Sequence, residues 1–275
     1  MFRLKQPGST PENTQPFDLS DRGLMLADGV FDTSRVVGGQ IILRSAHLTR
    51  LAGDAAALGI RASISDLEAL AEEALPEGGN GALRLTVTRG PGARGLAGEG
   101  AGAVTLISRF SPMNLPYPAA PVSLGVSTIR RNPTSPAARH KTLSYTDNIM
   151  ALREAAAAGH GEALLLSPEG NVACASAANV FARFSSLLLT PPVADGAMPG
   201  IVRGWLLSFA ENAGFDTAEE SLPPERLAEA DGIFLTNSLR IFQPVSAFGG
   251  RSFEPVLPEG LVRLGQALME GGAHD

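Results

Sequence analysis

Arginines at two places in the chain could bind an anion. Arg50 lies three residues after His47, so the two side chains are neighbours on a predicted helix. Arg50 is there either a solvated charge or an anion ligand in a cleft. A second candidate is Arg94, in the Gly-rich loop 89–96. Guanidinium groups suit bidentate capture of a carboxylate, so this loop either holds a substrate acid or is simply solvated.

Backbone groups and small side chains indicate further contacts with a ligand. The run 198–203 opens a predicted helix that extends to about Ala213. The free amides at a helix start can bind an anion, although an ordinary helix start gives the same pattern. The run 172–181 is rich in small residues, which let a backbone approach a ligand closely. The predicted strand 233–240 leaves hydroxyl and amide side chains at its end.

Lys141, in the middle of the chain, is an isolated cation. The run 139–145 reads Arg-His-Lys-Thr-Leu-Ser-Tyr, and its flanks are rich in Ala, Leu and Gly. Lys141 therefore does not belong to a charged surface run. The local sequence by itself favours a solvated lysine in front of a helix, because lysine side chains are mostly exposed.

The elements that would position these residues alternate between helix and strand. Val36 and Val37 predict a hairpin with 40–43 about a Gly-Gly turn, and Ser45 is a candidate cap for a helix over 46–58. Further helices are expected at 64–74, 146–159 and 261–269. Further strands are expected at 82–88, 103–108, 122–127, 162–167, 187–190 and 233–240, with a last one from Pro244.

The Pro-rich segment 110–121 is the strongest candidate for a linker. It predicts an N-terminal α/β domain over 1–109 and a C-terminal domain over 122–275. A chain of 275 residues is long enough for two such domains.

Composition excludes several classes of protein. The single Cys rules out an internal disulfide framework and fits a reducing cytoplasm. The four His and one Cys make no metal-ligand pattern. A net charge of −6 without a Lys/Arg cluster argues against a nucleic-acid partner. No apolar run is long enough to span a membrane, and the first residues lack the apolar core of a secretion signal. The Gly-rich segment 90–102 lacks the Gly-Lys-Ser/Thr ending of a nucleotide P-loop.

Several motifs follow one another in a specific order. They are Asp21-Arg22-Gly23 with 27–31 (Ala-Asp-Gly-Val-Phe), 47–51 (His-Leu-Thr-Arg-Leu), 141–145 (Lys-Thr-Leu-Ser-Tyr), 177–181 (Ala-Ala-Asn-Val-Phe), 190–203 (Thr-Pro-Pro…Pro-Gly-Ile-Val-Arg) and 236–245 (Thr-Asn-Ser-Leu…Pro-Val). In this order they resemble the class IV (fold type IV) pyridoxal-phosphate enzymes. That family includes branched-chain and D-amino-acid aminotransferases and 4-amino-4-deoxychorismate lyase, and the resemblance covers 21–245.

The resemblance implies a fold, a cofactor and a set of site residues. The fold would be of the α/β (α+β) type, two-domain and D-amino-acid aminotransferase-like, with pyridoxal 5'-phosphate in the interdomain cleft. Lys141 would be the catalytic Schiff-base lysine, in a cytoplasmic homodimer. The other cofactor-binding positions would be Arg50, Tyr145, Cys174, Asn179, Ile201, Val202 and Ser238. The substrate, an amino or keto acid or aminodeoxychorismate, would meet Thr33, Arg94 and Asn237.

One position departs from the family in a way that bears on the chemistry. Five residues before Asn179, where the family has a Glu that faces the pyridine nitrogen, this chain has Cys174. A carboxylate keeps that nitrogen protonated, whereas a neutral thiol is a weak donor or acceptor. We therefore expect the cofactor ring to be a weaker electron sink. The consequence would be slower transamination, a reaction that needs less electron withdrawal by the ring, or cofactor binding without activity. Cys174 is also compatible with a purely structural role as a small buried hydrophobic residue.

Other departures bear on the substrate. Ala27 replaces the usual Gly before Asp28. The Arg-x-His pair typical of D-amino-acid transaminases reads Arg94-Gly95-Leu96 here, which argues against a standard D-amino-acid enzyme. The run 89–95 is more similar to the aminodeoxychorismate lyase branch. Two hypotheses follow: an aminotransferase or lyase that uses Lys141, or a relative with altered or no catalysis because of Cys174.

Overall fold

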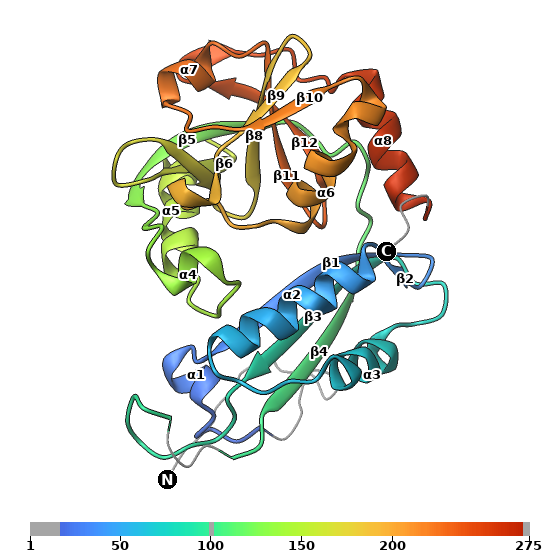
Figure 1. Cartoon of the computed structure of the whole chain (residues 1–275), viewed down its shortest axis with the longest axis vertical. Coiled ribbons are helices and arrows are strands. Elements are labelled where there is room, and N and C mark those ends of the chain that lie inside the picture. The colour runs from blue at the N-terminus through green and yellow to red at the C-terminus, as the bar shows by residue number, and fades with distance from the viewer. Residues whose placement is uncertain (1–16, 99–101, 272–275) are drawn as a thin grey trace.

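The computed structural model describes residues 17–98 and 102–271, which form two sheets with associated helices (Figure 1). The smaller sheet has the order β2-β1-β3-β4 and is antiparallel throughout. Its strands are β1 (Gly29–Val37), β2 (Gln40–Ile41), β3 (Gly81–Thr88) and β4 (Thr105–Pro112). The helices of this half are α1 (Arg22–Leu26), α2 (Arg44–Ala57) and α3 (Ile64–Ala74).

The helices α2 and α3 of the smaller half pack on the sheet through one apolar stripe each. In α2, Leu48, Leu51 and Ala55 recur at helical spacing and are buried. They share a core with Leu67 of α3 and Leu83 of β3. The side chains on the remaining faces of α2 are thus free to reach a neighbouring part of the molecule.

The larger sheet has nine strands and follows the order β10-β9-β8-β11-β12-β5-β6-β7, with β13 paired to β12. It is mixed: β9 with β10, β12 with β5, and β5 with β6 are parallel, and the other pairs are antiparallel. The strands are β5 (Val122–Arg130), β6 (Glu162–Leu166), β7 (Val172–Ala175), β8 (Asn179–Phe184), β9 (Leu187–Thr190), β10 (Asp216–Glu219), β11 (Gly232–Asn237), β12 (Ile241–Phe248) and β13 (Arg251–Ser252).

Helices cover the larger sheet in separate groups. They are α4 (Pro136–Arg139), α5 (Thr146–Ala157), α6 (Ile201–Phe209), α7 (Pro224–Ala228) and α8 (Glu259–Met269), with 3₁₀ turns at Val193–Asp195 and Ala210–Ala213. α6 and α8 share one core with β8, β11 and β12. α5 shares another with β6 and β7, in which Ala151 and Ala155 meet Cys174.

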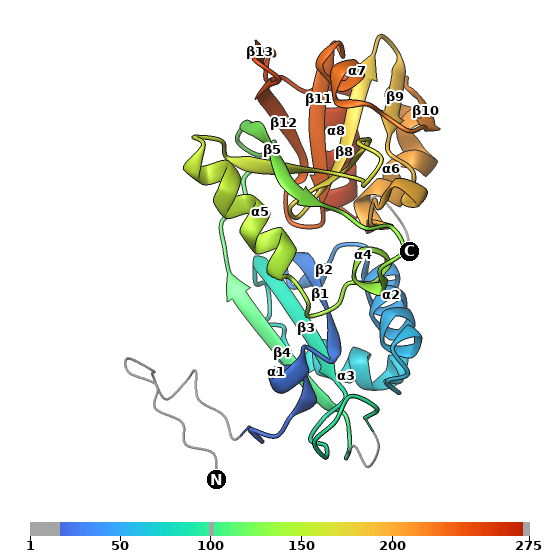
Figure 2. The same cartoon turned by 90° about the vertical axis from the view of Figure 1, so that its left-hand side faces the viewer.

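The segment that carries Lys141 joins the two halves. It connects α4 to α5 in the larger half, yet it forms a bridge between Thr142 and Val30 of β1. The Phe31 amide donates to the Lys141 carbonyl at 2.9 Å, and the Leu143 amide donates to the Gly29 carbonyl at 2.9 Å. Figure 2 shows the two sheets on either side of this connection, with α4 beside α2. The main chain around the lysine is therefore shared between the halves.

Much of the predicted element pattern is confirmed. The Val36–Val37 hairpin pairs with Gln40 and Ile41 about Gly38 and Gly39, which both have positive φ angles. The helix over 64–74 has the predicted bounds. The predicted strands are all present, with bounds that differ by a few residues. These elements follow from local turn residues and apolar spacing.

Two predicted ends differ in detail. The helical segment reaches Ala213 as predicted, but it is α-helical only to Phe209 and ends in a 3₁₀ turn. The strand β11 stops at Asn237, short of the predicted Arg240, because the chain turns there into β12. Two local predictions are wrong. Ser45 does not cap α2, because the helix begins at Arg44 and its N-cap is Leu43, in the left-handed conformation. The second concerns the linker.

The predicted linker 110–121 overlaps the strand β4. Phe110 pairs with Leu83 and packs against the core of the smaller half. Pro112 is tolerated because it is the last residue of an edge strand, where the missing N–H breaks no ladder. The segment between the two sheets is therefore 113–121, and a division into two domains at this segment stays a proposal.

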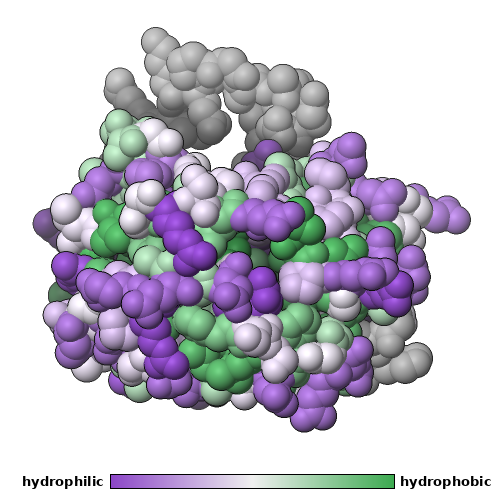
Figure 3. Space-filling view, turned by 90° about the horizontal axis from the view of Figure 1, so that it is seen from above, coloured by the Kyte–Doolittle hydropathy of each residue, from purple (hydrophilic) through white to green (hydrophobic). Residues whose placement is uncertain are grey.

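The part of the chain that the structure describes contains neither a helix that could span a membrane nor a cluster of metal ligands. Seen from the end formed by the larger sheet, hydrophobic residues lie in several patches separated by hydrophilic ones (Figure 3). No helix within residues 17–98 and 102–271 is long and apolar enough to cross a bilayer. The same residues contain no group of His, Cys, Asp and Glu that could hold a metal ion.

Candidate active site

A cavity of about 300 Å³ lies where the Lys141 segment joins the two halves, and both halves line it. All but one of the predicted site residues are among its walls: Thr33, Arg50, Lys141, Tyr145, Cys174, Asn179, Ile201, Val202, Asn237 and Ser238. The sequence analysis missed other members of the wall, among them Phe31, Arg84, Arg131, Asn148 and Arg203.

Lys141 presents its amine to this cavity between two aromatic rings. Nζ donates a hydrogen bond to the Tyr145 hydroxyl at 2.7 Å. The same nitrogen lies 4.6 Å from the centroid of the Phe31 ring. Phe31 and Tyr145 contact each other edge to face, with their centroids 5.0 Å apart. The amine is thus held in one place, next to a hydroxyl that can share its proton.

Arg50 is fixed by a buried carboxylate. Its Nε donates to Asp32 Oδ2 at 2.8 Å and its Nη2 lies 2.7 Å from the same oxygen. The other Asp32 oxygen is 2.7 Å from His47 Nδ1. Burial raises the pKa of Asp32, but the charge and hydrogen bond of His47, and then those of Arg50, outweigh it and hold this pKa below its usual range. The ionised Asp32 therefore keeps the Arg50 guanidinium oriented at the cavity.

Arg84 reaches the cavity without such a partner. Its guanidinium stacks on the Phe31 ring at 3.6 Å from the centroid, and within the described residues it has no hydrogen bond or ion pair. Burial lowers the pKa of Arg84, against smaller opposing effects of Tyr145 and Asp32, so an added anion would be favourable here. Arg84 lies opposite Thr33 in the ladder between β1 and β3.

The start of α6 forms another wall of the cavity. Gly200 is the N-cap and provides no side-chain cap, so the first-turn amides at Ile201 and Val202 can bind an anion. Asn179 holds this start, because its Nδ2 donates to the Met198 carbonyl at 2.8 Å. A Cβ on Gly200 would lie 2.0 Å from Asn179 Oδ1, so a larger residue here would displace the Asn179 amide.

Cys174 of β7 and Arg131, the residue after β5, form a further part of the wall. Burial raises the pKa of the Cys174 thiol, with Glu162 adding to this effect and Arg131 opposing it, so the thiol is neutral. Arg131 donates to the carbonyls of Ala137 and Ala138 at 2.9 and 3.2 Å. It forms no ion pair with any residue that the structure describes.

The charge of the cavity is one-sided. Arg50, Arg84, Arg131, Lys141 and Arg203 line it, and no Asp or Glu does so among the described residues. Arg203 is partly neutralised from outside, since it forms an ion pair with Glu219. This distribution favours anionic ligands.

Asn237 and Arg94 have local roles that compete with the predicted ones. The side-chain oxygen of Asn237, Oδ1, accepts from the backbone amides of Leu239 at 3.1 Å and Arg240 at 2.8 Å. This side chain therefore stabilises the turn. Arg94 is exposed and is not in the cavity wall. Both substrate roles stay predictions.

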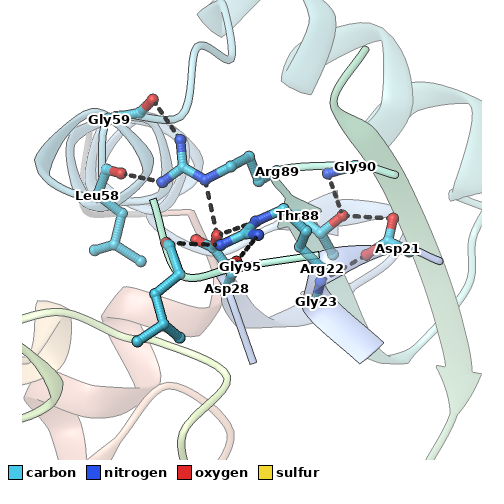
Figure 4. Close-up of polar contacts among 11 residues, drawn as sticks. Asp21, Arg22, Gly23, Asp28, Leu58, Gly59, Thr88, Arg89, Gly90 and Gly95 are labelled. Carbon is cyan, nitrogen blue, oxygen red and sulfur yellow. Dashed lines mark hydrogen bonds and ion pairs between the residues drawn. The ribbon is translucent and has the colours of Figure 1, made fainter. Parts of the chain in front are cut away.

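The loop that carries Arg94 is tied to α1. Arg22 donates to the carbonyls of Gly95 at 2.7 Å and Leu96 at 3.0 Å. Asp28 accepts from Arg22 Nε at 2.8 Å, and Figure 4 shows the contacts of Arg22 with Gly95 and Asp28. The Asp-Arg-Gly motif therefore anchors the loop at a distance from this chain's own cavity.

A two-sheet fold with a cavity lysine and several anion-binding groups defines a class of cofactor enzyme. A sequence model of the family Amino-transferase class IV matches residues 29–248, and the chain belongs to this family. Enzymes of this family depend on pyridoxal 5'-phosphate.

Known proteins similar to this chain include both branches of the family. A "Putative branched-chain-amino-acid aminotransferase" of Methanocaldococcus jannaschii is 31% identical over 84% of this chain and 82% of its own length. An aminodeoxychorismate lyase of Bacillus subtilis is 28% identical over 80% of this chain and 77% of its own. A hypothetical aminotransferase from Mycobacterium tuberculosis, in its pyridoxal-phosphate-bound form, has a TM-score of 0.81 at 26% identity and covers 98% of this chain and 97% of its own.

Proposed function

We propose that this enzyme uses pyridoxal 5'-phosphate, carried by Lys141, to act on an amino acid or another amino-carboxylate. The observation that supports this most is the Lys141 amine in a cavity whose walls otherwise supply anion-binding groups. When bound, the cofactor stabilises negative charge at the substrate carbon. Lys141 would then move the substrate proton as a general base and acid, and Tyr145 would orient its amine.

The residues of the cavity suit the cofactor's phosphate. Arg50, which Asp32 holds in place, provides one cation. The amides at the start of α6 provide donors and a favourable dipole. Ser238 adds a hydroxyl to the cavity wall. A phosphate dianion between these groups would satisfy all three.

Arg84 supports an amino-carboxylate as the substrate class. It is the cavity arginine whose guanidinium has no polar partner among the described residues, and it stacks on the same ring as Lys141 Nζ. A carboxylate at this place would lie near the amine and could bind the guanidinium bidentately. The negative charge of the substrate would also offset the cost of keeping Arg84 partly buried.

The test begins with cofactor binding. Purified protein incubated with pyridoxal 5'-phosphate is expected to show an absorbance band near the visible edge that borohydride shifts and Lys141→Ala abolishes. Absence of this band in the wild type would contradict the proposal. Assays then separate the branches: pyruvate release from aminodeoxychorismate without amino transfer indicates a lyase, and keto-acid formation from amino-acid pairs indicates an aminotransferase.

A second candidate function follows from Cys174. A neutral, buried thiol in the cavity wall is compatible with a relative that binds the cofactor but has altered or no catalysis. The variant Cys174→Glu tests it. Turnover that appears only in this variant supports the second candidate, and Lys141-dependent turnover in the wild type removes the non-catalytic form of it.

We further propose a homodimer in the cytoplasm. Leu24, Met25 and Leu26 of α1 and Leu96 of the loop that Arg22 anchors are exposed apolar side chains, which is consistent with a covered surface. Light scattering of the purified protein measures the mass. A monomer at micromolar concentration would contradict the dimer.

A further inference from the structure

Asp54 of the smaller half holds the main chain at Lys141, which lies between two helices of the larger half. Asp54 belongs to the last turns of α2, and its side chain is 11% exposed. Its Oδ2 accepts from the Lys141 backbone amide at 2.9 Å. Its Oδ1 lies 2.8 Å from His140 Nδ1. One carboxylate therefore binds the lysine and the residue before it, across 87 positions of sequence.

Both backbone polar groups of Lys141, its amide and its carbonyl, form hydrogen bonds with the smaller half. The Asp54 carboxylate takes the amide, and the amide of Phe31 donates to the Lys141 carbonyl at 2.9 Å. Both partners come from the smaller half, whereas α4 and α5 on either side of the lysine belong to the larger half. The ring of Phe31 also contacts Nζ. The position of the amine thus depends on how the smaller half holds this backbone.

Asp54 differs from the two carboxylates of the smaller half that pair with arginine, the buried Asp32 and the half-buried Asp28. Asp32 pairs with Arg50 and His47, and Asp28 pairs with Arg22 and Arg89. Within the described residues Asp54 pairs with no Arg or Lys, and its partners are His140 and the Lys141 amide. Burying a carboxylate is costly, and Asp54 is nearly buried beside the Lys141 amide. The position of Lys141 best explains why the carboxylate is there.

We propose that Asp54 is a positioning residue for Lys141, which keeps Nζ beside Phe31 and Tyr145. The consequence for catalysis rests on the proposed function of Lys141. Misplacing a reacting group by about 1 Å can lower a rate about 100-fold. We therefore expect Asp54→Ala to lower kcat about 10- to 100-fold while the affinity for pyridoxal 5'-phosphate changes little, because the phosphate contacts remain.

The direct test needs no turnover. Amide hydrogen exchange of the purified protein, with and without pyridoxal 5'-phosphate, reports the main chain of Lys141. A hydrogen bond to a charged acceptor contributes enough that its loss should speed local exchange about 10- to 100-fold. Asp54→Ala is expected to show this at Lys141 while the amides in the β1–β3 ladder keep wild-type protection.

Three further variants grade the effect. Asp54→Asn keeps an oxygen that can accept from the Lys141 amide but loses the charge, so it should lie between Asp54→Ala and the wild type. His140→Ala keeps the Lys141 contact and should be milder still. Glu73→Gln, an exposed carboxylate of α3, controls for a change of charge and should match the wild type.

The outcomes separate this proposal from the proposed function. If Asp54→Ala leaves the exchange of the Lys141 amide at the wild-type rate, Asp54 does not position the lysine. Asp54 is also excluded as a positioning residue if, in both Asp54 variants, exchange of the Lys141 amide speeds up only as much as exchange throughout the protein. A wild type that binds no cofactor at Lys141 contradicts the proposed function instead, and the exchange result for Asp54 still stands.

Discussion

The two arginines that reach the cavity from the smaller half are held in different ways. Arg50 donates to a buried carboxylate that is itself bonded to His47, whereas Arg84 rests on the face of Phe31 without a polar partner among the described residues. Arg50 is therefore fixed in advance, with its charge already partly matched. Arg84 keeps its hydrogen-bonding capacity for a ligand.

The difference matches the two kinds of anion that the proposed function requires. A cofactor phosphate is the same in every cycle, so a rigid, pre-paired cation suits it. A substrate carboxylate enters and leaves, and a cation with free donors gains more from each binding event. The comparison predicts that changes around Arg50 affect folding and cofactor affinity, and that changes around Arg84 affect the substrate.

The largest expected effect is at the carboxylate behind Arg50. Asp32→Asn leaves the half-buried Arg50 without its counter-charge and the buried His47 without its carboxylate partner. Removing one partner of a buried pair costs about 3 kcal/mol of the free energy of unfolding. Denaturant unfolding at neutral pH measures it. Glu68→Gln, an exposed carboxylate of α3, is the control and should change little.

The contribution of Asp32 to the free energy of unfolding also depends on pH, and the shift of its pKa gives the direction. The pKa of Asp32 is lower in the folded protein than its ordinary value of 3.8. Its contribution to stability is therefore complete above about pH 4 and is lost as the pH falls through the folded-state pKa. The stability difference between the wild type and Asp32→Asn should shrink in acid. A difference that stays constant from neutral pH to pH 3 would contradict the role of the ionised carboxylate.

Arg50→Gln should weaken the cofactor rather than the substrate. Loss of a charge-assisted contact with phosphate is expected to raise the Kd of pyridoxal 5'-phosphate about 30-fold, or about 2 kcal/mol. Titration of the absorbance band measures it. Arg44→Gln provides a matched control, because Arg44 is on the same helix and pairs with Glu72 at the surface. An equal effect of both variants would refute the assignment of Arg50 to the phosphate.

Whether the sequence predicts the role of each arginine depends on how far away in the sequence its contacts lie. Arg50 was predicted because its motif is local and its neighbour His47 is on the same helix. The strand that carries Arg84 was predicted as well, but the face of it that would border a cavity depends on where the larger sheet lies. Sequence spacing contains no such information.

Asp54 and the linker show the same limit. The two residues that Asp54 contacts, His140 and Lys141, are far away in sequence, so helical spacing could identify its helix but not its partner. The linker 110–121 was predicted from prolines, and Phe110 was assigned to it because a single strand does not reveal its pairing with Leu83. Elements defined by neighbouring residues were predicted, whereas these pairings between residues far apart in the sequence were not.

A smaller effect is expected at Arg84. Arg84→Gln should raise the KM for the amino-carboxylate substrate about 10-fold, or about 1.4 kcal/mol, with the Kd of pyridoxal 5'-phosphate unchanged. Arg109→Gln is the control, since Arg109 is the exposed cross-strand neighbour of Arg84. A change in cofactor affinity without a change in KM would mean that Arg84 serves the phosphate.

The smallest expected effect concerns the ring below Arg84. Phe31→Leu removes the stacking surface, and a cation–π contact of this kind is worth about 1 kcal/mol, so KM should rise a few-fold. Phe31 also contacts Lys141 Nζ, and the single variant therefore mixes two effects. A double-mutant cycle with Arg84→Gln separates them. If the ring acts on the substrate through Arg84, the two changes in KM will be less than additive, whereas additive changes would mean that Phe31 acts through the lysine.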